Sequence, residues 1–178
     1  RGGSATVHFP IWHKEIEDII VLKNNKGTED NRVRKLDYSI QLSKLFYERF
    51  INDEEITLFS PHEVPELYEA WGSDSFDELY KTAERKTSVS KKKVSAQTLM
   101  FDMLKERAET GRIYIMNIDH CNTHSSFKDR VYMSNLCQEI TLPTDPIQHI
   151  DGQGEIALCI LSAINVGKLN YLEDLEGL

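Results

Sequence analysis

Short β-favouring segments alternate with helical patterns along the chain, and this alternation constrains the fold more than any other feature. Strands are predicted over residues 4–9, 38–42, 56–59 and 113–118. Residues 156–161 form a continuous apolar run, which is typical of a strand buried on both faces. Strands separated by helices indicate an α/β fold with a parallel component.

Helices are predicted between these strands from the spacing of the apolar residues. The patterns cover residues 12–20, 45–50 and 64–85, the last broken at Gly72-Ser73. Segment 38–42, in contrast, alternates like a half-buried strand. A polar loop is expected to follow residue 118 and to continue through Phe127.

The clearest predicted helix carries one apolar stripe and ends at Gly111. Three lysines, Lys91 to Lys93, are interpreted as its solvated start. A membrane or partner-binding face is the alternative to core packing for the stripe, and core packing is favoured. The stripe consists of Ala96, Leu99, Met100, Met103, Leu104 and Ala108.

Composition limits the function classes. The chain has 178 residues, of which 40% are hydrophobic and 28% charged, as in a soluble globular domain. The net charge of -8 argues against non-specific nucleic-acid binding, and no apolar run is long enough to cross a membrane. Three irregularly spaced cysteines argue against a secreted disulfide scaffold, so a reducing, cytoplasmic location is expected.

Both ends give the impression of truncation. The chain starts with Arg1 rather than Met and runs directly into a strand-like segment. Residues 171–178 have the pattern of a helix that opens and then stops. We therefore expect a fragment or a split-gene product rather than a complete enzyme.

Segment 134–140, Ser-Asn-Leu-Cys-Gln-Glu-Ile, contains the most informative residues. In an extended chain, Asn135, Cys137 and Glu139 would point to one face, presenting an amide, a thiol and a carboxylate together. Spacing alone favours a plainer interpretation, in which a buried cysteine and two exposed polar residues occupy a strand. A cysteine hydrolase would need a nearby histidine, and no local signature supports one.

A metal site is not predicted. His120, Cys121 and His124 lie close together in the sequence, but no fourth ligand follows at a suitable spacing.

Segment 134–140 resembles the finger-loop motif of class I ribonucleotide reductase large subunits, closest to bacterial and bacteriophage members. The resemblance covers nearly the whole chain in order, through segments 1–6, 12–27, 56–61, 110–122 and 154–163. It implies that residues 1–178 are a partial catalytic barrel domain. The family fold is a ten-stranded α/β barrel with a central finger loop, of which this chain would supply some strands and helices.

The resemblance also implies roles for individual residues. Cys137 would become a thiyl radical and take the 3′ hydrogen of the ribose, while Glu139 accepts the 3′-hydroxyl proton. Asn135 would bind the sugar hydroxyls. Cys159 would form a redox disulfide with a partner outside the chain, and Arg1 would lie at the substrate site.

The implied reaction is the reduction of ribonucleoside diphosphates to deoxyribonucleoside diphosphates for DNA synthesis. Expected partners are the radical-generating, metal-containing small subunit, thioredoxin or glutaredoxin, and the remaining segments of the large subunit, with ATP and dNTP as effectors. No metal, nucleic acid or membrane is expected to bind this chain, and the isolated chain is expected to be inactive. The alternative is a non-catalytic product of a split or decayed gene that only assembles with other barrel pieces.

Overall fold

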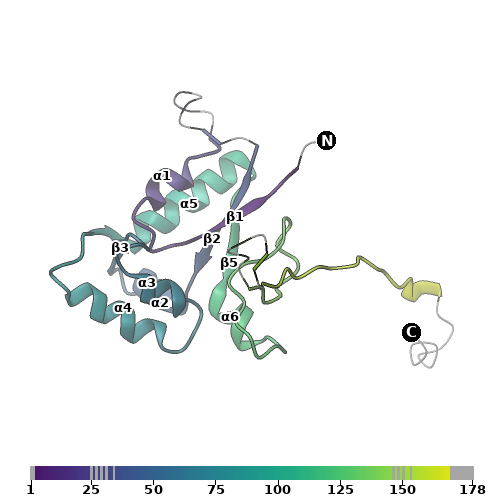
Figure 1. The fold of residues 1–178 in the computed structure, drawn as a ribbon. Helices are drawn as coiled ribbons and strands as arrows, with labels where there is room; N and C mark the ends of the chain where they lie inside the picture. The colour runs from purple at the N-terminus through teal and green to yellow at the C-terminus, as the bar shows by residue number, and fades with distance from the viewer. Residues whose placement is uncertain are drawn as a thin grey trace.

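A three-stranded parallel sheet forms the centre of the computed structural model, which describes residues 3–24, 26, 28, 30, 32–33, 35–145, 147, 149, 151–152 and 154–168 (Figure 1). Its strands are β1 (Thr6–Pro10), β2 (Asp37–Leu42) and β5 (Tyr114–Asn117), in the order β1-β2-β5. All the pairings in this sheet are parallel, so the predicted α/β fold with a parallel component is confirmed.

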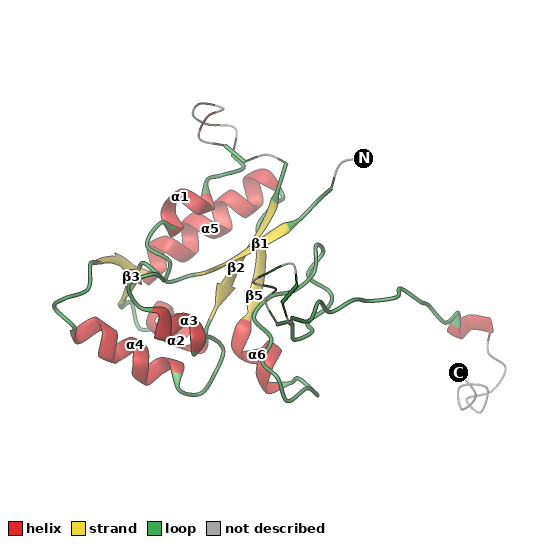
Figure 2. Ribbon diagram, viewed as in Figure 1, coloured by secondary structure: helices red, strands yellow, loops and turns green. Residues whose placement is uncertain are grey.

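The central strand β2 is buried on both faces. Residues 38–42 are all buried, including the polar Ser39 and Gln41. The prediction of a half-buried strand was therefore wrong. Helices α1 and α5 lie on one side of the sheet, and the loop that follows α6 lies on the other (Figure 2).

A second sheet has two antiparallel strands, β3 (Glu55–Phe59) and β4 (Lys91–Ser95). The interpretation of Lys91 to Lys93 as the start of a helix was wrong, because these residues pair with β3. Their ammonium groups stay in solvent, and Lys93 lies 3.4 Å from a Glu55 carboxylate oxygen. Charged side chains of this kind protect an edge strand from pairing with other chains.

Six α-helices occur among the described residues, and most lie where the spacing predicted them. The first begins later than expected, and the last occupies part of the expected polar loop, which is a correction. They are α1 (Ile16–Ile20), α2 (Lys44–Ile51), α3 (Pro65–Glu69), α4 (Phe76–Arg85), α5 (Ala96–Thr110) and α6 (Ile118–Thr123).

Helix α5 shows clear local signals at both ends. The Ser95 hydroxyl accepts a hydrogen bond from the Thr98 amide at 3.2 Å, and Gly111 ends the helix in the left-handed conformation with φ of 64°. The four stripe residues from Ala96 to Met103 are buried. Leu104 and Ala108 are exposed, and the buried face continues through Glu106 instead, so the last part of the predicted stripe was wrong.

The predicted break between α3 and α4 is confirmed, and Gly72 is required there. Its φ is +77°, and a Cβ atom at this position would lie 2.6 Å from Asn122 Nδ2. A larger residue would therefore be strained in its backbone and would collide with α6.

An aromatic cluster connects β3 with α3, α4 and the segment before α1. The rings of Trp71 and Phe76 are 4.6 Å apart, and those of Phe59 and Tyr80 are 5.5 Å apart, both edge to face. The buried Tyr80 hydroxyl accepts from the Thr57 amide at 2.8 Å and donates to the Thr57 carbonyl. On the side of β3 that faces away from β4, the Tyr80 hydroxyl thus supplies the hydrogen bonds of both the Thr57 amide and the Thr57 carbonyl.

The prediction of a buried strand over residues 156–161 was wrong. This segment is irregular, and the side chains of Ile160 and Leu161 are 93% and 80% exposed. It runs away from the sheet toward the short 3-10 turn Val166–Lys168 (Figure 1). Within the described ranges no strand lies beside it beyond the single bridge between Asp145 and Glu155, so its apolar side chains have nothing to pack against.

In the portion of the chain that the structure describes, no helix combines the length and apolarity needed to span a bilayer.

We predict that Tyr80→Phe lowers the free energy of unfolding by about 1–3 kcal/mol, because a buried backbone amide and carbonyl lose their partner. Urea denaturation of the 178-residue chain measures this change. Tyr132→Phe is the control, since among the described residues its hydroxyl makes a single, exposed contact of 3.4 Å with the Glu69 carbonyl. An unchanged stability of Tyr80→Phe would show that the Thr57 contact is unimportant.

Candidate functional site

One face of the parallel sheet carries polar side chains. His8 pairs with Ser39 in the β1–β2 register, and Thr6 and Gln41 lie two positions away on their own strands. Since side chains alternate along a strand, these four residues face the same side. The other face carries Tyr38, Ile40 and Leu42, which belong to the hydrophobic core.

The loop after α6 lies over this polar face and is held there by side chains of α6 and β2. The Asn122 side chain donates to the Val131 carbonyl at 3.0 Å and accepts from the Val131 amide at 2.9 Å. Gln41 donates to the Tyr132 carbonyl at 2.5 Å and accepts from the buried Trp71 indole at 2.7 Å. Both attachments are made to backbone groups, so they position the chain rather than particular side chains.

Strand β1 makes the next attachments. His8 Nε2 lies 3.1 Å from the Ser134 carbonyl oxygen and 3.3 Å from the Ser134 amide nitrogen, and the tautomer decides which bond forms. The Thr6 hydroxyl donates to the Leu136 carbonyl at 2.6 Å. Burial lowers the pKa of the His8 ring, although the Ser134 backbone contact opposes the shift. The ring therefore lies against the loop in its neutral form.

Segment 134–140 forms a tight turn rather than an extended strand. The Gln138 amide donates to the Asn135 carbonyl at 3.1 Å, with Leu136 and Cys137 at the corner. The Asn135 side-chain oxygen accepts from the Ile140 amide at 3.0 Å, which closes the turn. The expectation that alternate residues share one face of an extended segment was wrong, because the chain reverses at Cys137.

The turn still brings three of the predicted site residues into one short loop. Cys137 and Glu139 are exposed, and Asn135 is half-buried. Within the described residues, the hydrogen bonds of the Asn135 side chain all use Oδ1, so Nδ2 can donate to a ligand.

The other two predicted site residues are not part of this arrangement. Cys159 is an exposed free thiol in the segment that runs away from the sheet (Figure 1). Arg1 lies outside the described residues.

Sequence reasoning missed the residues that hold the turn. Ser39, Gln41 and Gln138 contribute side-chain hydrogen bonds between the sheet and the loop. The available signal was the alternation of polar and apolar residues in segment 38–42, which was interpreted as a face open to solvent. The hydrogen-bonding groups of such a face can be satisfied equally well by a polar loop or by bulk water. The alternation of residues therefore could not distinguish a covered polar face from an exposed one.

No cluster of three or more His, Cys, Asp or Glu side chains suited to a metal ion occurs in the described part of the chain. The rings of His120 and His124 meet edge to face with centroids 5.5 Å apart. Cys121 is half-buried, and this burial raises the pKa of its thiol.

A hollow of about 510 Å³ lies at the carboxyl ends of β2 and β5. Leu42, Asn117 and His120 are among its lining residues, and the Tyr47 hydroxyl donates to Asn117 at 2.7 Å across it. Ligands of parallel sheets usually bind outside the carboxyl ends of the strands. This edge of the sheet is therefore open to a ligand or to another part of a larger protein.

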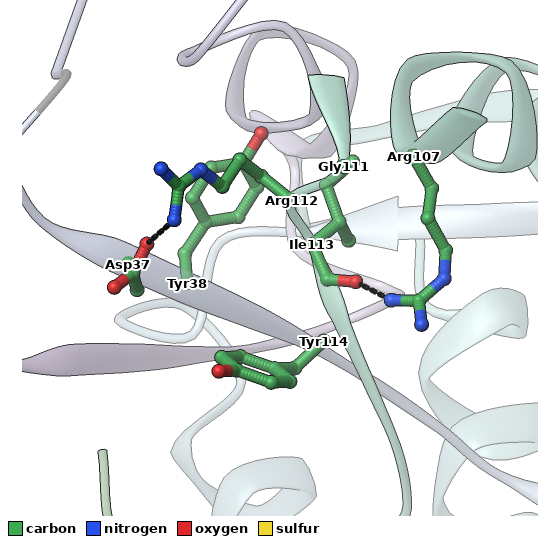
Figure 3. A pocket seen from close by; sticks show the side chains of 7 residues that line it. All are labelled: Asp37, Tyr38, Arg107, Gly111, Arg112, Ile113 and Tyr114. Carbon is green, nitrogen blue, oxygen red and sulfur yellow. Dashed lines mark hydrogen bonds and ion pairs between the residues drawn. The ribbon is translucent and has the colours of Figure 1, made fainter. Parts of the chain in front are cut away.

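A smaller hollow of about 110 Å³ lies at the opposite end of the sheet (Figure 3). Arg112 lies 3.7 Å from an Asp37 carboxylate oxygen, and Arg107 donates to the Ile113 carbonyl. Figure 3 shows both guanidinium groups directed at these partners rather than into open space. We therefore assign this hollow to the packing of α5 on the sheet.

The lowered pKa of His8 predicts a pH dependence of stability. The unfolded chain protonates this ring near its ordinary pKa of 6.5, above the folded value. The stability that neutral His8 contributes is therefore fully present above about pH 6.5 and is lost as the pH falls through the lower folded pKa.

Urea denaturation at about pH 7.5 and about pH 5 measures this effect, and the parent chain should lose more stability than His8→Gln. His13, whose pKa burial also lowers, remains in both proteins and cancels in the difference. His62→Gln, at an exposed histidine, is the matched control and should behave like the parent. Equal losses in parent and His8→Gln would contradict the assignment.

Known proteins match this chain along its whole length. The family model described as "Ribonucleotide reductase, barrel domain" matches residues 1–177. The "Ribonucleoside-diphosphate reductase subunit alpha" of Haemophilus influenzae is 56% identical over 97% of this chain, and that of Enterobacteria phage T4 is 47% identical over 96%. The Escherichia coli protein "Ribonucleoside-diphosphate reductase 1 subunit alpha" is 53% identical over 83%.

The chain spans only part of these relatives. It covers 24% of the Haemophilus protein, 23% of the phage T4 protein and 20% of the Escherichia coli protein. The described strands accordingly form an open sheet that is part of a barrel and not a closed one. The chain belongs to the ribonucleotide reductase barrel domain family.

Proposed function

We propose that residues 1–178 are the central part of the catalytic barrel of a class I ribonucleoside-diphosphate reductase large subunit. The complete enzyme would reduce ribonucleoside diphosphates to deoxyribonucleoside diphosphates for DNA synthesis. The observation that carries this proposal is 56% identity to a reductase alpha subunit over 97% of the chain. A polar loop that presents a thiol, an amide and a carboxylate on one turn adds support.

Cys137 is assigned the radical role. Its thiol lies at the exposed corner of the turn, where a bound ribose could reach it. A thiyl radical at this sulfur takes the 3′ hydrogen atom, which restores the S–H bond and leaves a carbon radical on the sugar. Glu139 accepts the proton of the 3′-hydroxyl, and the 2′-hydroxyl, protonated by a reduced thiol of the redox pair that includes Cys159, then leaves as water.

Asn135 is assigned to substrate binding. Its oxygen is used inside the turn, where it accepts from the Ile140 amide at 3.0 Å. The Nδ2 group remains to donate to a sugar hydroxyl. The same side chain would therefore shape the turn and orient the substrate. Arg1 is assigned to the edge of the substrate site on the family resemblance alone.

Cys159 is assigned to the redox pair, with its partner thiol on another segment of the large subunit. The two thiols would supply two electrons and end as a disulfide, which thioredoxin or glutaredoxin then reduces. The apolar run around Cys159 is exposed, with Leu158 at 81% and Ile160 at 93%. Burying such a run is favourable, so we assign it to contact with the remaining barrel segments.

The remaining partners follow from the same proposal. A radical-generating small subunit that contains a metal would supply the radical, and ATP and dNTP effectors would bind elsewhere in the large subunit. The three free cysteines suit a reducing compartment, so we place the enzyme in the cytoplasm.

A non-catalytic role in assembly is the second candidate. The exposed apolar run from Ile156 to Leu161 favours docking to other barrel pieces, with or without catalysis. Activity of an assembled enzyme therefore distinguishes the two candidates.

We predict that Cys137→Ser abolishes deoxyribonucleotide formation. The test uses a hybrid in which this chain replaces the matching region of the Haemophilus influenzae alpha subunit, combined with a small subunit and thioredoxin. A serine hydroxyl cannot form the sulfur radical, so no product should appear above the level without enzyme. Product formation from a ribonucleoside diphosphate, measured by chromatography, gives the result.

Cys121→Ser is the matched control and should retain the activity of the parent hybrid, since Cys121 lies on α6 and outside the turn. Activity in Cys137→Ser would contradict the radical role. A parent hybrid that assembles but forms no product would favour the assembly role.

A further inference from the structure

Gln138 follows Cys137 in the sequence, and its side chain bridges two strands of the sheet. Its Oε1 atom accepts from the Ser39 hydroxyl on β2 at 2.7 Å. Its Nε2 group donates to the Ile115 carbonyl on β5, also at 2.7 Å. We call these two hydrogen bonds the Gln138 clamp.

The backbone conformation at Gln138 favours glycine, so the local conformation does not explain why a glutamine stands there. Its side chain does. Its φ is +64°, a left-handed conformation that costs a non-glycine residue roughly 1–2 kcal/mol. Glycine would adopt this conformation without strain. A glutamine at this position is explained by its clamp, because both ends of its amide are used and the residue is half-buried.

The strand side of the clamp is rigid. Ser39 is completely buried at the centre of the sheet, where β2 pairs with β1 on one side and β5 on the other. In the β2–β5 register Ser39 pairs with Tyr114, the neighbour of Ile115. The clamp therefore joins the turn to two adjacent strands at one level of the sheet.

The other attachments hold the loop only on the N-terminal side of Cys137, the last of them being the bond from the Thr6 hydroxyl of β1 to the Leu136 carbonyl at 2.6 Å. The bonds of Val131, Tyr132 and Ser134 are made before the turn begins. Asn135 bonds only within the loop. Among described side chains of segment 134–140, Gln138 alone connects the turn to both β2 and β5.

We propose that Gln138 is a positioning residue for Cys137, an inference that rests on the proposed function. The clamp sets the height of the Cys137 sulfur above the sheet and hence its distance from the 3′ hydrogen of a bound ribose. A displacement of about 1 Å at a reacting atom costs up to roughly 100-fold in rate. Gln138 itself does not contact the ribose, so its loss changes the chemical step and not substrate binding.

The test compares Gln138→Gly with the parent in the same reductase hybrid. Glycine relieves the backbone strain and removes the clamp, so a residue needed only for the turn would be replaced without loss. We expect kcat to fall roughly 10- to 100-fold with KM changed by no more than about twofold. The kinetic isotope effect with 3′-deuterated substrate should rise, because hydrogen abstraction becomes slower relative to the other steps.

Ser39→Ala and Gln138→Glu, measured in the same hybrid, each remove one of the two hydrogen bonds of the Gln138 clamp. Ser39→Ala removes one bond of the clamp and should give an intermediate kcat, with no further loss when combined with Gln138→Gly. Gln138→Glu can still accept from Ser39, but its carboxylate cannot donate to Ile115, so it should not restore the parent rate. Urea denaturation of each variant shows whether a loss of rate exceeds the loss of folded protein.

The outcomes separate this inference from the proposed function. An inactive Cys137→Ser hybrid together with a Gln138→Gly hybrid at the parent kcat would overturn the positioning role and leave the proposed function intact. Activity in Cys137→Ser, or no activity in the parent hybrid, would overturn the proposed function and this inference with it. A raised KM at unchanged kcat would also overturn the positioning role, since it would place Gln138 in substrate binding.

Discussion

A polar face buried on a parallel sheet needs hydrogen-bond partners, and this requirement connects the sheet to the loop after α6. Thr6, His8, Ser39 and Gln41 lie on that face, and each bonds to a group in the loop. Ser39 and Gln41 are fully buried, and leaving them without partners would cost roughly 1–3 kcal/mol for each. The loop therefore follows one path across the sheet, although its described residues form no helix or strand.

The same bonds explain how the cysteine proposed to carry the radical can lie on an irregular segment and still be held in one place. Cys137 is exposed, while its neighbours Leu136 and Gln138 bond to β1, β2 and β5. Sites on loops are usually less precise than sites on strands. Here the strands transfer their rigidity to the loop through side chains on both sides of the cysteine.

Features set by nearby residues were predictable from the sequence. The end of α5 at Gly111 and the break at Gly72-Ser73 were both predicted, and both glycines adopt a positive φ. The start of α5 was placed too early, although Ser95 provides a local capping signal. Features set by distant partners were not predictable. Lys91 to Lys93 become a strand by pairing with β3, and the turn at Cys137 depends on a bond between residues 99 positions apart. Residues 156–161 have the composition of a buried strand, but burial requires neighbours that the described residues do not supply.

Amide hydrogen exchange in the 178-residue chain measures the turn around Cys137 directly. The Gln138 and Ile140 amides donate to the backbone and side-chain oxygens of Asn135, so they should exchange at least about tenfold slower than in an unstructured peptide. Protection of these two amides would show that the turn is closed at the cysteine, as expected for a loop held against the sheet. Exchange of both at the unstructured rate, with β2 still protected, would contradict the central claim that the polar sheet face positions Cys137.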